Sequence, residues 1–274
     1  MIAAGIITFR EGLEAALIVG IVLGYLAKAG DARSRRLAWL GVALAAAGSI
    51  MLAALLQAIG TGLQGRLEQI FEGTTMLLAA LILTWMIFWM RHQAHNMREG
   101  LEQGLRQAIA SNAGWGILGL TFLAVFREGV ETALFLSAAA FSGAGSGLLV
   151  GSVLGLTLAA GVGWGIYHAA THLDLGKFFD VTSILLLLFA AGLIAHGIHE
   201  FQDAALFPTL VAHVWDMNAI LDENSFVGLM LKSLFGYNGN PSLLEVIAYV
   251  GYYAIILSSI RWWTTRLALR TVEE

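Results

Sequence analysis

The feature that most constrains this chain is a charged phrase that occurs twice inside apolar segments. Residues 9–17 read FREGLEAAL, and residues 126–134 read FREGVETAL. Lenient insertion scales put the cost of each charged side chain at the centre of a membrane helix at roughly 2.5–3.5 kcal/mol. Such groups normally face a bundle interior or a wet cavity and mark an ion or substrate path. A structural Arg–Glu pair that ties helices together is the alternative, and the repeated spacing favours the functional interpretation.

The spacing within each copy places the charges together. On a helix, Glu11 and Glu14 share a face, and Arg10 reaches the same side because it lies four residues before Glu14. The second copy repeats this arrangement with Arg127, Glu128 and Glu131. Neighbouring carboxylates repel one another, so some of them hold protons until a metal ion displaces those protons. The arginines either limit this repulsion in the empty state or only hold the helices in register.

Composition sets the class of protein. Of the 274 residues, 58% are hydrophobic and only 12% are charged, against roughly 45–50% and 25% in soluble domains. We therefore expect an all-α polytopic membrane protein. The chain has no cysteine, which excludes disulfides and thiolate metal sites. It contains no P-loop motif, so we do not expect ATP hydrolysis.

The apolar segments predict seven transmembrane helices in a single permease domain, residues 1–274. The expected spans are 2–27, 37–59, 70–90, 114–141, 148–168, 181–201 and 243–263. They divide into a first repeat at about 1–91, a second repeat at about 113–201, an outer loop at 202–242 and a seventh helix at 243–264. Within the outer loop we expect an amphipathic helix over 210–234, lying at the membrane interface.

Basic residues predict the orientation. Connections on one side of these spans carry eleven of the lysines and arginines, and those on the other side carry Arg66 and Lys232. The positive-inside rule then places the N-terminus outside and the C-terminus inside. The two charged helices would be antiparallel, and the first three spans would be inverted relative to the next three. Inverted repeats with polar groups near the midplane are typical of secondary transporters.

Further polar residues lie at the outer ends of two spans. Glu68 and Glu72 open the third span, and His196, His199 and Glu200 close the sixth. On the predicted topology they share one side and form a candidate vestibule that collects metal ions. Solvated helix ends are the alternative, since an acidic residue at a helix N-terminus is stabilised by the helix dipole.

The two REGxE motifs resemble the signature of the oxidase-dependent iron transporters, a family that includes the fungal high-affinity iron permeases and the bacterial EfeU group. The resemblance extends to residues 71–73, 83–86, 88–91, 189–193 and 234–237, and to Pro241-Ser242. It implies iron import, with ferric iron handed over by an external ferroxidase or iron-delivery partner. It also implies that the functional residues are Arg10, Glu11, Glu14, Arg127, Glu128 and Glu131.

Carboxylate oxygens are hard ligands and suit hard ions such as Fe³⁺, Mn²⁺, Mg²⁺ or Ca²⁺. We expect the four glutamates to bind iron as the transported ion, with no tightly bound cofactor. We expect the protein to lie in the lipid bilayer of the cell membrane and not to bind nucleic acid. The sequence leaves open whether it forms a homo-oligomer.

Two other functions remain open from the sequence. One is an intramembrane di-metal carboxylate enzyme; such sites use Glu-x-x-His pairs, whereas both motifs here read Glu-x-x-Glu. The other is a membrane subunit that senses metal without transporting it, and only a transport assay separates this function from that of a carrier.

Overall fold

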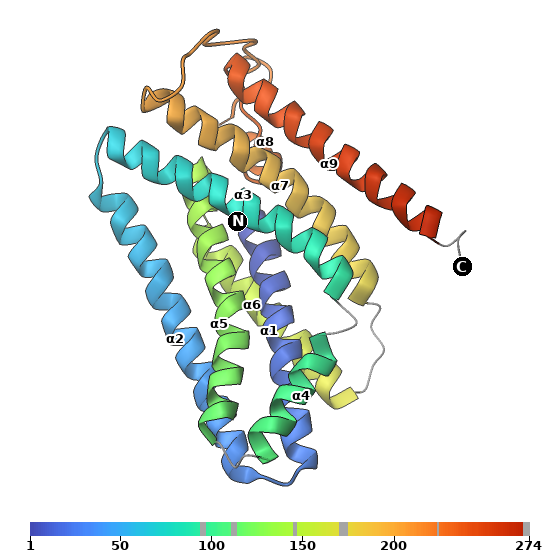
Figure 1. Ribbon diagram of the computed structural model, residues 1–274. Coiled ribbons are helices and arrows are strands. Elements are labelled where there is room, and N and C mark those ends of the chain that lie inside the picture. The colour runs from blue at the N-terminus through green and yellow to red at the C-terminus, as the bar shows by residue number, and fades with distance from the viewer. Residues whose placement is uncertain (94–96, 111–113, 145–146, 170–174, 224, 271–274) are drawn as a thin grey trace.

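The computed structural model describes residues 1–274 apart from 94–96, 111–113, 145–146, 170–174, 224 and 271–274. Its described residues form a bundle of long helices (Figure 1). The helices are α1 (Ile2–Lys28), α2 (Ala32–Gly62), α3 (Arg66–Gln93), α4 (Met97–Ala110), α5 (Gly114–Ala139), α6 (Leu148–Ala169), α7 (Leu175–Asp203), α8 (Phe226–Phe235) and α9 (Leu243–Arg270). A short π-helical turn, η1 (Ala140–Ala144), follows α5 directly.

Five of these helices are long and apolar enough to cross a membrane: α2, α3, α6, α7 and α9. The remaining two long helices, α1 with 27 residues and α5 with 26, have comparable length. Each of them carries one arginine and two glutamates of the repeated motif. With three charged residues, neither helix qualifies as a purely apolar span. The prediction of a polytopic helical membrane protein is thus confirmed, and a full set of seven spans stays a prediction.

The helices are longer than the predicted apolar spans because polar residues extend them. The second span was expected from residue 37, but α2 begins at Ala32. Asp31 caps this helix by accepting hydrogen bonds from the backbone N–H groups of Arg33 at 3.0 Å and Ser34 at 3.1 Å. The Ser34 hydroxyl also donates to the Asp31 carboxylate. These bonds lower the pKa of Asp31 below its usual value, as expected for a carboxylate that caps a helix.

Packing places α1 and α5 at the centre of one half of the bundle. The helix α2 packs along α5, and α6 packs along α1, while α1 and α5 contact each other. A second group forms as α3 packs on α7 and α9 packs on the other side of α7 (Figure 1). The buried residues Met76, Leu83, Phe189 and Leu193 lie at the core of this second group.

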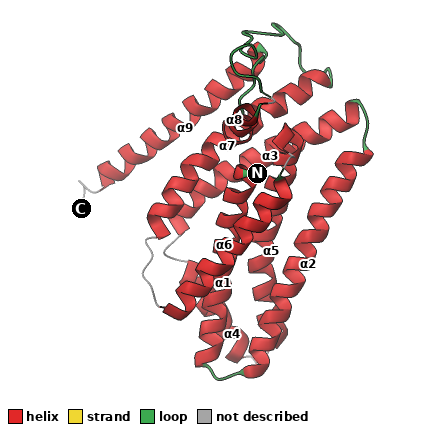
Figure 2. Ribbon diagram, turned by 180° about the vertical axis from the view of Figure 1, so that it is seen from behind, coloured by secondary structure: helices red, strands yellow, loops and turns green. Residues whose placement is uncertain are grey.

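The segment between α7 and α9 corrects one expectation. A helix was predicted over 210–234, but the helix found there is α8, which spans only Phe226–Phe235. The backbone N–H groups of Val214 and Met217 donate to the carbonyls of Pro241 at 3.0 Å and Gly239 at 2.8 Å. These bonds between distant segments take the donors that a helix would need. The loop folds back at the end of the bundle where α7 ends and α9 begins, which we call the loop end (Figure 2).

Candidate metal site

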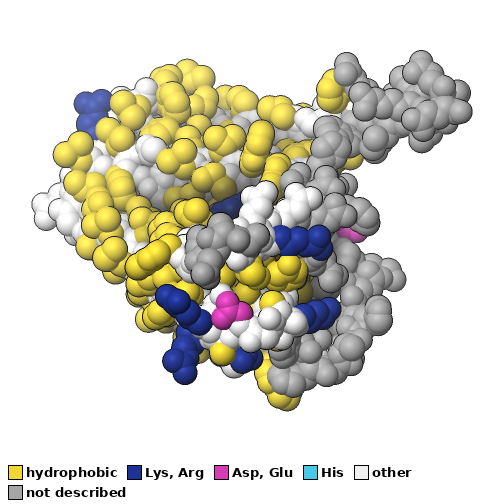
Figure 3. Space-filling view, turned by 60° about the horizontal axis from the view of Figure 1, so that its bottom comes forward, with side chains coloured by type: hydrophobic (Ala, Val, Ile, Leu, Met, Phe, Trp, Pro, Cys, Tyr) yellow, Lys and Arg dark blue, Asp and Glu magenta, His cyan; other side chains and the backbone are white. Residues whose placement is uncertain are grey.

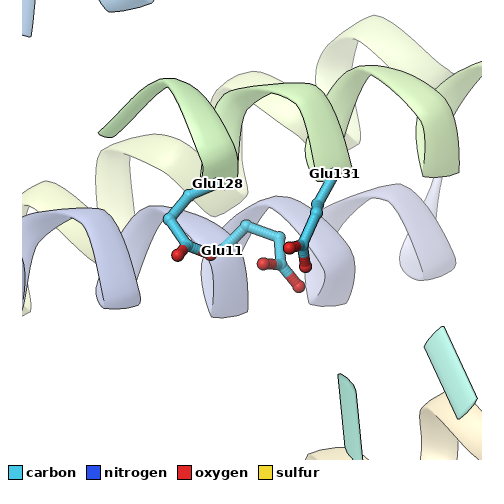
Figure 4. A group of neighbouring side chains, drawn as sticks. All are labelled: Glu11, Glu128 and Glu131. Atoms are coloured by element: carbon cyan, nitrogen blue, oxygen red, sulfur yellow. The ribbon is translucent and has the colours of Figure 1, made fainter. Parts of the chain in front are cut away.

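Three carboxylates meet where α1 and α5 contact each other. Glu11 comes from α1, and Glu128 and Glu131 come from α5; each offers an oxygen, and these oxygens lie within 4.8 Å of one another. Figure 4 shows the three side chains pointing toward a common space between the two helices. We call these three residues the carboxylate triad. Two helices and both sequence motifs therefore contribute to one cluster.

The carboxylate triad is buried and only partly satisfied. The exposed fraction is 1% for Glu11, 4% for Glu128 and 9% for Glu131. In each residue the Oε2 atom is buried and has no hydrogen-bond partner among the described residues. Buried polar groups without partners are rare in folded proteins and need an explanation. A bound cation or protons shared between the carboxylates would satisfy these oxygens, and their chemistry suits a hard metal ion.

Arg10 is the buried counter-charge of the first motif. Its Nη1 atom lies 2.6 Å from Oε1 of Glu11, and its Nη2 atom lies 3.1 Å from Oε1 of Glu14. The Arg10 side chain has an exposed fraction of 0%, and Nη1 also lies 3.2 Å from the sulfur of Met86 on α3. One guanidinium therefore holds both glutamates of its own motif.

Glu14 lies beside the carboxylate triad but does not belong to it. Its carboxylate is held by Arg10 and is close enough to Glu131 for the two charges to interact. We expected four glutamates to share one space, and the structure brings three of them within ligand distance of one another. The fourth is the partner of an arginine at the edge of the cluster.

Arg127 occupies a different environment in the second motif. Its Nε atom lies 3.1 Å from Oε1 of Glu131, and its side chain is 44% exposed. The guanidinium carbon lies 4.4 Å from the ring centre of Trp89 on α3, within the range of a cation–π contact. No ion pair joins Glu128 to an arginine within the part of the chain that the structure describes.

The glycine inside each motif permits a close helix contact, as expected from its lack of a side chain. A Cβ atom added to Gly12 would lie 3.0 Å from Cβ of Ala159 on α6. A Cβ atom added to Gly129 would lie 2.6 Å from Cβ of Ser49 on α2 and would overlap its hydroxyl. Gly12 thus allows α6 to pack closely on α1, and Gly129 allows α2 to pack closely on α5.

A cavity of about 290 Å³ adjoins the carboxylate triad. It lies between α1, α2 and α5, and Glu11 and Glu128 form part of its wall together with Ser49 and Thr132. The rest of the lining is apolar. The cavity leaves space beside the carboxylates on the side of α2.

The candidate vestibule residues are only partly brought together. Glu72 interacts electrostatically with Glu68 and Glu200, so these three carboxylates share the loop end. His196 instead bonds to its own helix, with Nδ1 lying 3.0 Å from the Gly192 carbonyl.

His199 turns toward α9 and has partners that we did not predict from the sequence. Its Nδ1 atom lies 3.0 Å from Oε1 of Glu245, and its Nε2 atom lies 3.7 Å from Oδ2 of Asp203. Two sequence signals could have found these partners. Asp203 follows His199 by one helical turn, and Ser242-x-x-Glu245 has the form of a capping box at the start of an apolar run.

Comparisons with known proteins cover nearly the whole chain. The model of the "Iron permease FTR1 family" matches residues 1–270. The chain is 37% identical over 249 residues to "Ferrous iron permease EfeU" of Escherichia coli O6:H1, covering 90% of both chains. It is 36% identical to the protein of the same name from Yersinia pestis, covering 90% of this chain and 88% of that protein. A further relative, at 36% identity, is the "Putative inactive ferrous iron permease EfeU" of Escherichia coli strain K12. No solved structure matches.

Proposed function

Because this chain belongs to the iron permease FTR1 family, we propose that it imports iron through the carboxylate triad at the contact of α1 and α5. The family and its relatives are iron permeases, and five helices of this chain are long and apolar enough to cross a membrane, so the chain is a multi-pass membrane transporter and not an enzyme. The observation that carries the proposal is the meeting of three buried carboxylates from both motifs within ligand distance. Their unpartnered oxygens supply hard ligands for the transported ion.

The charge of the cluster suits a multivalent cation. Four glutamates and two arginines give a net charge of −2 when all of them are ionised. Iron would displace any protons that the carboxylates hold when the site is empty. A membrane potential of 100 mV, negative inside, favours inward movement by about 2.3 kcal/mol per elementary charge. Inward movement of iron therefore needs no hydrolysis of ATP by this chain.

Close contacts support an inverted repeat. A Cβ atom on Gly41 of α2 would meet the Leu118 carbonyl and the Phe122 N–H of α5, and one on Gly151 of α6 would meet the Met1 carbonyl and the Gly5 N–H of α1. The separation of 117 positions is the same for Met1 and Leu118, for Gly5 and Phe122, and for Arg10 and Arg127. We propose that α1–α3 and α5–α7 are the two repeats, with the carboxylate triad on their shared axis.

The distribution of basic side chains supports an orientation with the loop end outside. Lysine and arginine side chains gather at the opposite end of the molecule (Figure 3). The exposed basic residues at this end, where α1 joins α2, include Lys28, Arg33, Arg35 and Arg36. Under the positive-inside rule this end faces the cytoplasm. A cysteine introduced as Met1→Cys should then react with an impermeant thiol reagent from outside, and one introduced as Glu274→Cys only from inside. Labelling of both from the same side would contradict the proposed topology.

In this orientation iron enters the protein at the loop end. Glu68, Glu72 and Glu200 would raise the local concentration of cations there, as a charged cleft does. For Glu72→Gln we expect a few-fold higher iron concentration for half-maximal uptake and an unchanged maximal rate. The rise in that iron concentration should be smaller at high salt, because salt screens charges that are accessible to solvent. A collapse of the maximal rate would instead place Glu72 in the translocation site.

The oxidation state of the iron has two candidates. The resemblance implies ferric iron delivered after oxidation by an external ferroxidase, and an all-carboxylate site suits that hard ion. The relatives' names describe ferrous iron permeases. Uptake is measured with ascorbate, which keeps iron ferrous, with an Fe³⁺ chelate, and with Fe²⁺ plus a ferroxidase. The condition that supports uptake separates ferrous from ferric iron as the transported ion. A ferroxidase partner is a further part of the proposal.

The test is uptake by purified protein in liposomes loaded with a metal-quenched dye. External Fe²⁺, Fe³⁺ and Mn²⁺ are added in turn to the unchanged protein and to Glu128→Gln. We expect iron-dependent quenching that Glu128→Gln abolishes, because the variant keeps the size of the side chain and removes one ligand charge. Equal quenching by both proteins at equal reconstitution would overturn the proposal that the carboxylate triad carries the ion.

A further inference from the structure

His199 lies in the last turn of α7 at the loop end, between two carboxylates from different positions in the chain. Its Nδ1 atom lies 3.0 Å from Oε1 of Glu245 on α9, and its Nε2 atom faces Asp203, one turn further along α7. The side chains of His199 and Asp203 are 43% and 51% exposed, whereas that of Glu245 is 2% exposed. The imidazole is therefore anchored on one side by a buried carboxylate and open to solvent on the other.

Glu245 is held rigidly, so it fixes the imidazole. Its Oε1 atom also accepts a hydrogen bond of 3.0 Å from the backbone N–H of Ser242, and its Oε2 atom accepts one of 2.8 Å from the side-chain amide of Asn238. In the neutral imidazole whose Nδ1–H donates to this carboxylate, the lone pair lies on Nε2. Histidines that bind metals almost always donate their other ring N–H to a carboxylate, a carbonyl or a water molecule in this way.

The second ring nitrogen of His199 and the carboxylate of Asp203 are spaced for a shared ion. Nε2 of His199 and Oδ2 of Asp203 are 3.7 Å apart, which is too long for a hydrogen bond. Two ligand atoms that each lie about 2.0–2.2 Å from one metal ion are separated by a distance of this order. Glu200 is close enough to interact electrostatically with both His199 and Asp203, and Glu68 is close to Glu200. One nitrogen of His199 and one carboxylate of Asp203 thus lie at ligand distance, and Glu200 and Glu68 add negative charge nearby.

We propose that His199 and Asp203 form a loading site for a transition-metal ion at the loop end, with Glu245 as the residue that positions the imidazole. Its part in uptake rests on the proposed function, whereas ion binding at this site does not. Imidazole favours transition metals over Mg²⁺ and Ca²⁺, and carboxylates alone do not make that distinction. The loading site therefore supplies a selectivity that the all-oxygen carboxylate triad lacks.

Binding tests the site without transport. Equilibrium dialysis with Co²⁺ is carried out on protein carrying Glu128→Gln, which disables the carboxylate triad. Adding His199→Gln or Asp203→Asn should weaken Co²⁺ binding by about 10–100-fold, and Glu245→Gln should weaken it by about 10-fold through the loss of orientation. The matched control is His213→Gln, because His213 is an exposed histidine in the loop before α8. Equal Co²⁺ binding by the His199→Gln and His213→Gln proteins would overturn the site, whatever the Glu245 variant does.

Uptake in liposomes tests the selectivity. With excess external Ca²⁺, the unchanged protein should keep its iron uptake, whereas His199→Gln should need about 10-fold more iron for half-maximal uptake and keep its maximal rate. Iron uptake by His199→Gln that resists Ca²⁺ as well as the unchanged protein would contradict the loading role. If the unchanged protein moves no iron, the proposed function fails and the dialysis result still decides whether the site exists.

Discussion

The two copies of the motif have the same spacing but occupy different environments. Arg10 is fully buried and pairs with both glutamates of its own copy. Arg127 is 44% exposed, pairs with Glu131 as its one carboxylate partner among the described residues, and rests against the ring of Trp89. In the first copy the guanidinium is a fixed part of the core, and in the second copy it lies at the edge of the cluster.

This difference assigns separate roles to residues that the sequence presents as equivalent. A buried arginine that balances two buried carboxylates cannot be removed without leaving charge uncompensated in a low-dielectric interior. A half-exposed arginine can be replaced by solvent or can move, so its loss changes the charge of the cluster more than the fold. We infer that the first copy sets the structure of the site and that the second leaves Glu128 free for the ion.

The largest effect should come from removing the buried arginine. Arg10→Met leaves Glu11 and Glu14 without their counter-charge, which we expect to cost about 3–5 kcal/mol. Arg127→Met removes a partner whose side chain is 44% exposed, so water can take its place and the cost should be smaller than for Arg10→Met. Thermal unfolding of the two purified variants in detergent measures this contrast. Two variants of equal stability would show that the burial of Arg10 has no energetic consequence.

A second contrast separates the equivalent glutamates Glu14 and Glu131. Glu131 belongs to the carboxylate triad and Glu14 does not, so Glu131→Gln should weaken iron binding by about 10–100-fold. Glu14→Gln should weaken it by less than about 10-fold, since Glu14 is not among the three carboxylates whose oxygens lie within ligand distance of one another. Equilibrium dialysis with ⁵⁵Fe on both variants gives the two affinities. The reverse order of affinities would mean that the ion is held nearer to the first copy.

The smallest of these effects concerns the two motif glycines. Gly129→Ala would place Cβ against Ser49, whereas Gly12→Ala meets side-chain carbons at 3.0–3.1 Å. We expect Gly129→Ala to cost about 1–3 kcal/mol, as overpacking usually does, and Gly12→Ala to cost less. Ser49→Gly should restore the stability of the Gly129→Ala protein because it removes both clashing atoms. Without that rescue, the loss would have to arise elsewhere than at the contact with α2.

Much of the fold could be predicted because lipid-length apolar runs have few alternative structures. The segments predicted as spans are helical, although residues 140–141 of the fourth fall in the π-helical turn η1. The errors lie mainly at the ends, where residues such as Asp31 cap a helix beyond the apolar run. The segment 210–223 could not be predicted, since the backbone bonds of Val214 to Pro241 and of Met217 to Gly239 depend on a distant part of the chain.

The candidate site could be predicted in identity but not in geometry. The repeated motif named all six charged residues, because charge inside an apolar segment is visible in the sequence. Which carboxylates share a space depends on the side-chain directions of Arg10 and Glu14. The sequence cannot reveal these directions, because the spacing of the arginine and the glutamates is the same in both copies. Glu245 was missed because His199 reaches α9 only in the folded bundle, whereas the spacing of Asp203 one turn after His199 on α7 could have been seen in the sequence.

The central claim is that the carboxylate triad binds the transported ion, and ion binding tests it most directly. ⁵⁵Fe binding is measured by equilibrium dialysis on protein carrying His199→Gln, so that the loading site does not contribute. We predict that this protein binds one iron ion and that adding Glu11→Gln, Glu128→Gln or Glu131→Gln lowers the affinity by about 10–100-fold. Iron binding that is unchanged by all three substitutions would contradict the claim.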